Sequence, residues 1–180
     1  MRRWILGCGV TLFVVALPQI PVYASPFGWG EFGADVPFGS STSLSIDLGS
    51  NVSLGLAPDG PNFSGTGSHI VTVTSTDVVG YLLYVHATSG TDMVSGSATI
   101  PASSNTSAGA LAVNTWGYNT TGSTSQFLGM LNSNSLLKDA DGPYKNGDQT
   151  TITYGALAGP TQAAGAYTVA VTYTAVAKNQ

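Results

Sequence analysis

The sequence predicts an all-β protein, a two-layer antiparallel sandwich of Ig-like or jelly-roll-like type that follows an N-terminal signal peptide. Short runs of alternating apolar and polar residues recur along the chain, separated by turns rich in Gly, Pro, Asn and Ser. No stretch keeps a helical period long enough for a sizeable helix. The clearest run is the last, residues 164–177, where Tyr167, Val169, Val171 and Tyr173 alternate with smaller or polar residues. It predicts a strand with one buried face.

Residues 1–24 have the three parts of a Sec signal peptide, so we expect the protein to be exported to the extracellular space or the cell surface. A pair of arginines forms the positive start, residues 4–17 form the apolar run, and residues 22–24 form a small-x-small cleavage site. The mature chain is then expected to begin at Ser25 and to have no membrane segment.

Three alternatives for this leader are weaker. A lipoprotein cysteine follows the apolar run, whereas Cys8 precedes most of it. Arg2 and Arg3 lack the flanking residues of a twin-arginine signal. A retained membrane helix needs ~20 apolar residues, and here Pro18 and Pro21 follow a shorter run. A cleaved leader is therefore the preferred interpretation.

The chain that remains is acidic and poor in charge. Residues 25–180 contain three lysines, no arginine and all nine acidic residues, which gives a net charge of −6. So few basic groups offer no surface to phosphate backbones, and nucleic-acid binding is not expected. The mature chain also has no cysteine, so its stability must come from a hydrophobic core. We expect one domain over residues 42–180.

Residues 25–41 form a glycine- and aromatic-rich N-terminal arm without a clean period. Phe27, Trp29, Phe32 and Phe38 lie among glycines and prolines. We favour an irregular segment that lies against the domain, and the alternative is an arm that docks onto another subunit.

Alternation begins directly after the arm. Residues 44–48 and 52–56 alternate on either side of Gly49, which predicts two short strands or one strand with a bulge at that glycine. Residues 57–61 have the Pro and Gly content of a turn.

Residues 68–74 and 81–87 are predicted to pair as a hairpin around the turn at 77–80. The register that buries the apolar residues places five of them on the inward face of the hairpin, namely Val71, Val73, Tyr81, Leu83 and Val85.

This register also places four other side chains. His69 lies on the face of the valines and His86 on the opposite face, so the two cannot share a metal ion, and no metal site is expected there. Leu82 and Tyr84 lie on the outer face. Apolar side chains there indicate either a second layer or a contact surface.

The remaining candidate strands are residues 97–100, 110–118, 126–131 and 149–154. Residues 136–148 between them have the composition of a long acidic and glycine-rich loop. Trp116 is interpreted first as a core residue, because tryptophan within a strand is more often buried than exposed as a platform.

Few residues indicate chemistry. Asp139, Asp141, Asn146 and Asp148 cluster in the acidic loop and could hold calcium, but their spacing does not fit an EF-hand and a solvated turn is favoured. Glu31 is the only glutamate, no serine lies in a nucleophile-elbow motif, and the only cysteine is in the leader. We therefore predict no catalytic residues and no enzymatic activity.

Several blocks are spaced as in a group of known proteins. They are residues 97–102, 111–118, 151–155 and 165–175, of which Trp116-Gly117-Tyr118 is the most specific. In them the chain resembles secreted surface proteins of candidate-phyla-radiation (Saccharibacteria-like) bacteria, and its final strand is similar to those of WxL-type, fimbrial and spore-coat domains. The resemblance implies a surface-exposed β-sandwich and brings no catalytic residues. Many such proteins have a C-terminal anchor, whereas no sorting motif precedes Gln180.

Two non-catalytic function classes remain. The first is a structural or adhesive subunit of the bacterial cell surface that self-associates or contacts the cell wall and its glycans, with Leu82 and Tyr84 in the contact surface. The second is a carbohydrate-binding module of the cell surface or extracellular matrix that uses Trp29, Trp116 or Tyr118 as a stacking platform. Burial of Trp116 separates the two, because a platform must be exposed.

We expect the exported protein to begin at Ser25, because the cleavage site ends at the preceding residue. Mass spectrometry of protein recovered from the medium or the cell surface should give the mass of residues 25–180. A mass that includes Met1, or a lipid on Cys8, would contradict the signal-peptide interpretation.

Overall fold

The computed structural model describes residues 7–9 and 43–178, which contain strands, bends and turns and no helix. None of these described segments is therefore an apolar helix able to cross a bilayer. The N-terminal arm at 25–41, including Trp29, lies outside the described residues, as does most of the leader. The strands are β1 (Gly7–Gly9), β2 (Ser43–Leu48), β3 (Ser53–Gly55), β4 (Ala57–Asp59), β5 (Asn62–Thr76), β6 (Gly80–Ala87), β7 (Met93–Ser95), β8 (Ala98–Ile100), β9 (Thr115–Asn119), β10 (Ser135–Asp141), β11 (Asp148–Ala158) and β12 (Val171–Lys178).

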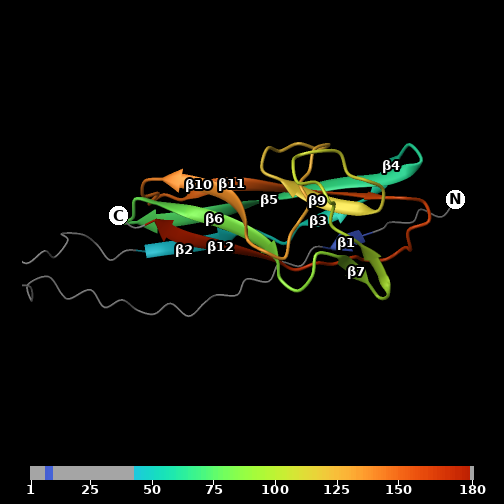
Figure 1. The fold of residues 1–180 in the computed structure, drawn as a ribbon, viewed down its shortest axis with the longest axis horizontal. Coiled ribbons are helices and arrows are strands. Elements are labelled where there is room, and N and C mark those ends of the chain that lie inside the picture. The colour runs from blue at the N-terminus through green and yellow to red at the C-terminus, as the bar shows by residue number, and fades with distance from the viewer. Residues whose placement is uncertain (1–6, 10–42, 179–180) are drawn as a thin grey trace, which may run out of the picture.

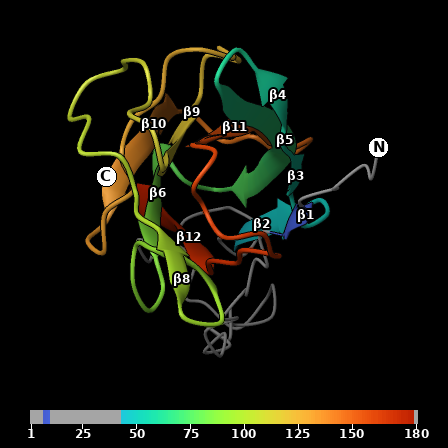
Figure 2. The ribbon, with the colours of Figure 1, turned by 90° about the vertical axis from the view of Figure 1, so that its right-hand side faces the viewer.

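Two antiparallel sheets pack face to face, which confirms the predicted all-β sandwich (Figure 2). One sheet has the order β2-β5-β11-β9, with β4 also paired to β5, and the other has the order β10-β6-β12. Two short pairs, β1 with β3 and β7 with β8, complete the described strands. Figure 1 shows β5 and β11 extending along the molecule, with β6, β10 and β12 over one end and β3 and β7 at the other.

The core lies between the sheets and is rich in aromatic residues. The six residues expected in the interior are all buried, namely Val71, Val73, Leu83, Val85, Val169 and Val171. Trp116, Tyr81, Tyr154 and Tyr167 are the largest fully buried side chains among the described residues. Each aromatic ring removes ~150–250 Å² from water, so this core can stabilise a domain without disulfides.

The predicted hairpin of residues 68–74 and 81–87 is wrong in its pairing. β5 pairs with β2, β4 and β11, whereas β6 pairs with β10 and β12 in the opposite sheet. The connection crosses between the layers at Asp77, which has φ 56°, and at Gly80, which has φ 157°. Alternation specifies which face of a strand is buried but not which strand lies beside it, and a hairpin and a crossover bury the same side chains.

Of the two alternatives predicted around Gly49, the structure has two separate short strands, β2 and β3, and not one strand with a bulge. β2 pairs with the end of β5, the chain leaves the sheet after Gly49, and β4 pairs again with the start of β5. Between them β3 lies against β5 where that strand has two glycines. A Cβ atom on Gly65 would lie 2.5 Å from the carbonyl oxygen of Gly55, and one on Gly67 would lie 3.0 Å from that of Ser53. These glycines therefore allow β3 to contact the backbone of β5.

Several expected element bounds change. The last strand is only β12, because residues 164–170 leave the sheet and Thr168 forms a bridge with Val94. The strand expected at 110–118 is reduced to β9. The first part of the acidic loop expected at 136–148 is instead the strand β10, which pairs with β6. Polar strands at sheet margins carry little hydrophobic alternation, so their sequences resemble loops.

Replacing Gly65 with Ala should destabilise the mature protein by about 1–3 kcal/mol, because the new methyl group overlaps a backbone oxygen of β3. Urea unfolding of both proteins measures the difference. The matched control is Gly55→Ala, where a Cβ atom meets nothing within 4 Å. Equal stability of the two variants would contradict the close contact between β3 and β5.

Candidate functional site

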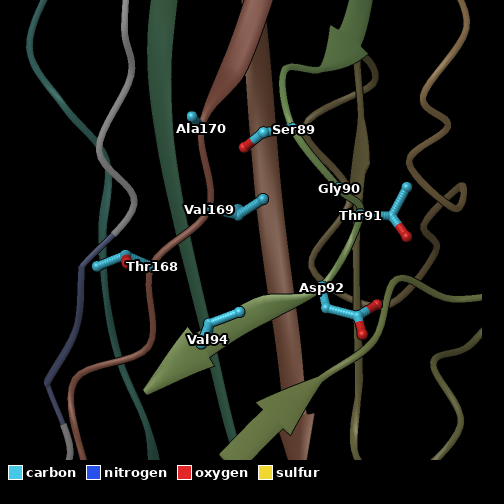
Figure 3. Close-up of a pocket in the computed structure, with 8 residues that line it drawn as sticks. All are labelled: Ser89, Gly90, Thr91, Asp92, Val94, Thr168, Val169 and Ala170. Carbon is cyan, nitrogen blue, oxygen red and sulfur yellow. The ribbon is translucent and has the colours of Figure 1, made fainter. Parts of the chain in front are cut away.

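A cavity of about 560 Å³ opens between two chain segments, residues 89–94 and 168–170 (Figure 3). The segments are joined at both ends of the opening. The Thr88 amide donates to the Ala170 carbonyl over 2.9 Å at one end, and Val94 and Thr168 exchange amide hydrogen bonds of 2.9 and 3.0 Å at the other. Between these two attachment points, residues 89–93 curve away from residues 168–170. The cavity lies in the gap between the two segments.

The lining of this cavity is small and weakly polar. Figure 3 shows the Ser89 and Val169 side chains directed into the opening, whereas those of Thr91 and Asp92 point to the other side of the loop. Asp92 is its only carboxylate, and the lining has no aromatic side chain. The cavity therefore has neither the pair of carboxyl groups used for glycoside hydrolysis nor a stacking face for a sugar ring.

A second cavity of about 280 Å³ lies beside the edge strand β10. Its polar lining includes Asn105 and the hydroxyl side chains of residues 103, 104, 106 and 135, and Tyr118 also contacts it. Leu131 and Leu136 form its apolar side and are 53% and 54% exposed. Hydroxyl and amide groups next to apolar side chains suit a neutral polar ligand or a side chain of another protein.

The structure confirms the first interpretation of Trp116 as a core residue, and Tyr118, the other described residue of the alternative sugar platform, is a core residue as well. Trp116 is 0% exposed and Tyr118 is 3% exposed, so neither presents a ring face to solvent. The Trp116 indole N–H donates to the Thr91 carbonyl over 2.8 Å, and its ring lies 6.2 Å from that of Tyr154. The strand pattern around Trp116 would be the same if its ring were buried or exposed. The loops that cover the strand decide the exposure of the ring. Trp29 lies outside the described residues.

Leu82 and Tyr84 do lie on the outer face of β6, as expected, and both are half-buried. The register adds two neighbours that the sequence did not single out. Leu136 pairs with Tyr84, Val176 pairs with Leu82, and these two are 54% and 47% exposed. We call these four residues the outer-sheet patch. Leu136 was missed because it precedes a β-bulge in a segment of loop-like composition.

The acidic cluster does not form a calcium site. Asp139 and Asp141 both pair with Lys178, the second over 2.9 Å. Asp148 lies 2.7 Å from the Lys138 ammonium and also accepts a 2.7 Å hydrogen bond from the Tyr81 hydroxyl. The carboxylates are thus divided between two lysines because β10 and the start of β11 hold them apart, and no group of three potential ligands occurs in the described chain.

A buried polar chain links the two sheets. The His69 Nε2 lies 2.8 Å from the Tyr173 hydroxyl, which lies 2.5 Å from the Tyr154 hydroxyl. His69 and Tyr154 belong to one sheet and Tyr173 to the other. Burial lowers the pKa of the His69 imidazole, and the nearby Ser50 backbone opposes this shift in part. His69 is therefore a neutral structural residue, and His86 is half-buried on the outer face of β6.

Two asparagines in Asn-x-Ser/Thr sequences hold loops together. The Asn105 amide nitrogen donates to the carbonyls of Gly109, Ala110 and Phe127. The buried Asn119 donates to Ser123 and Gln126. Both amide groups are thus engaged in the folded protein. The serine- and threonine-rich loops around the second cavity owe their fixed shape to these contacts.

These features define an all-β sandwich with two surface cavities and one exposed apolar patch among its described residues. No known family model, curated protein or solved structure matches the chain.

The buried His69 predicts a loss of stability in acid. Its pKa lies below the ordinary value of 6.5, so below that pH the unfolded chain takes up a proton that the folded protein does not. The free energy of unfolding should fall by up to about 1.4 kcal/mol per pH unit as the pH decreases from 6.5 towards the folded-state pKa. Urea unfolding at several pH values measures this slope.

The His69→Gln variant should show a flatter slope over this range, even if it is less stable at every pH. Val113→Gln, at a loop residue that is 49% exposed, is the control and should keep the wild-type slope. An unchanged slope in His69→Gln would assign the acid sensitivity to other groups.

Proposed function

We propose that this chain is a non-catalytic, secreted bacterial cell-surface protein that serves as a structural or adhesive subunit. The observation that supports it best is the outer-sheet patch on β6, β10 and β12. Exposed apolar side chains in neighbouring register positions usually mark a surface that another molecule covers. The patch lies on the face of the three-stranded sheet, where its side chains come from three neighbouring strands.

The surroundings of the patch favour contact through its face. Thr172 and Thr174 adjoin it on β12 and are neutral and half-buried. Asp139 lies in register with Leu82, and both it and Asp141 form ion pairs with Lys178 at that end of the patch. Burial of an apolar side chain contributes roughly 1.5–3 kcal/mol, so four such residues can hold a contact without charge attraction.

The β10 edge of the three-stranded sheet is less suited to pairing with another strand. β10 is interrupted by a bulge between Leu136 and Lys138. The bulge is followed by Lys138 and Asp139. Bulges and charged residues on an edge strand oppose the addition of a further strand. Association through the patch would therefore bring sheet faces together and would not extend the sheet at β10.

A carbohydrate-binding role is a second candidate, and the 280 Å³ cavity is the observation that favours it. Serine and threonine hydroxyls line it, as in sites that bind sugar hydroxyl groups. This places the candidate sugar site away from the buried Trp116. Isothermal titration with cell-wall glycan fragments tests this role, and Leu131→Asp should abolish any binding that depends on the cavity.

Substitution of the patch should weaken self-association of the mature protein or its retention on cells. We expect Leu136→Asp and Val176→Asp each to lower the association constant by about tenfold or more, since each removes one buried apolar contact. Sedimentation over a range of concentrations measures association, and fractionation measures retention.

Val113→Asp is the matched control, because Val113 is 49% exposed on a loop away from the patch. Thermal unfolding of all three variants establishes that the sandwich remains folded. Two results together would contradict the proposal. The wild-type protein would stay monomeric, and cells would retain both patch variants to the same extent as the wild-type protein.

A further inference from the structure

The turn between β10 and β11 contains the one Asn-Gly pair of the chain, Asn146-Gly147. The Asn146 side chain is exposed to solvent. In such a pair the backbone nitrogen of the second residue can attack the carbonyl carbon of the asparagine side chain. Glycine hinders this approach least, because it has no Cβ atom. Asn146 is therefore the asparagine of this chain that is most open to attack by its own backbone.

The structure requires a glycine at position 147. Its φ is 85°, a conformation that residues with a side chain rarely adopt. A Cβ atom there would also lie 2.7 Å from the Cγ2 methyl group of Thr72 on β5. The packing of the turn against β5 thus retains the residue that makes Asn146 reactive.

We propose that Asn146 is a site of spontaneous deamidation whose rate is set by the turn around it. The Gly147 nitrogen gives up its proton to solvent and forms a bond to the Asn146 Cγ with its electron pair. The bond between Cγ and the side-chain nitrogen breaks, and that nitrogen takes up a proton and leaves as ammonia. Water, the only co-reactant, then opens the cyclic imide at either carbonyl. The products are aspartate and isoaspartate at position 146.

The turn restrains the attacking nitrogen. The Gly147 amide donates to the Tyr144 carbonyl over 3.1 Å, and the Ser75 amide donates to the same carbonyl over 3.2 Å. The Tyr144 amide in turn donates to the hydroxyl oxygen of Ser75 over 3.0 Å, and Ser75 is buried. A hydrogen-bonded amide gives up its proton less readily, and an anchored backbone limits movement of the nitrogen towards Cγ. Deamidation therefore proceeds when the turn opens locally.

The modification changes the start of β11. Isoaspartate carries the main chain through the former side chain and adds a methylene group to the backbone just before Asp148. That carboxylate lies 2.7 Å from the Lys138 ammonium and accepts a 2.7 Å hydrogen bond from the Tyr81 hydroxyl. These contacts connect β11 with β10 and β6 of the other sheet. A longer backbone before Asp148 displaces its carboxylate and weakens the connection between the sheets at this end.

Peptide mapping by mass spectrometry, after incubation of the folded protein at mildly alkaline pH, tests the site. Aspartate and isoaspartate should accumulate at position 146. Asn134 is the internal control, because it is also exposed but is followed by Ser135. We expect its conversion to be about tenfold slower or more, since a side chain on the following residue hinders the attack. Conversion of Asn146 no faster than that of Asn134 overturns the proposal.

The Ser75→Ala variant tests the role of the turn, because it removes the acceptor of the Tyr144 amide. We expect about fivefold faster deamidation of Asn146, the effect of one lost hydrogen bond on a local opening equilibrium. Thr88→Ala is the matched control, since it loses an exposed hydroxyl contact with Thr172 away from the turn, and it should react at the wild-type rate. Urea unfolding establishes that both variants remain folded. Equal rates in all three proteins would overturn control by the turn.

The Asn146→Gln variant tests the effect on β11, because its longer side chain disfavours the cyclic imide. After the same incubation, the wild-type protein should unfold at a lower urea concentration than before, and Asn146→Gln should unfold at an unchanged one. An equal loss of stability in both would assign the damage to another residue. Isoaspartate at position 146 without any loss of stability would overturn the predicted displacement of Asp148.

Discussion

The contact of β3 with two glycines of β5 is the constraint on which the shape of the sandwich depends. The three-stranded sheet covers only one end of the long β5–β11 pair, and β3 covers the inner face of β5 beyond it. A side chain at Gly65 would occupy the space of the β3 backbone, so Val52 and Leu54 could no longer reach the interior. A single short strand thus completes a layer that would otherwise need another sheet.

Polar groups in the interior add specificity to this packing. The hydroxyls of Tyr154 and Tyr173, together with His69, form hydrogen bonds between layers that are otherwise held by non-directional apolar contacts. Hydrogen bonds with fixed geometry restrict how one sheet can slide over the other. The Trp116 indole contributes in the same way by anchoring the loop that borders the larger cavity. The same buried imidazole that orders the layers makes the domain sensitive to acid.

The three-stranded sheet carries both ion pairs and apolar side chains. Lys138 and Lys178 pair with acids of β10 and β11, and Asp139, one of the partners of Lys178, lies in register with Leu82. The outer face of the sheet carries Leu82, Tyr84, Leu136 and Val176. Contact through this face, as proposed, would be largely hydrophobic with one charged neighbour.

The sequence by itself determined the all-β class, the inward faces of the long strands and the outward position of Leu82 and Tyr84, because a period of two fixes the face of every residue in a strand. Only the tertiary structure decided which strands pair. Val71 and Leu83 are buried in a hairpin and in a crossover alike, so alternation could not separate β5 from β6. Likewise, two further features depend on residues from other parts of the chain. They are the division of the aspartates between two lysines and the pairing of Leu136 with Tyr84. Contacts at that sequence separation leave no local pattern from which they could be read.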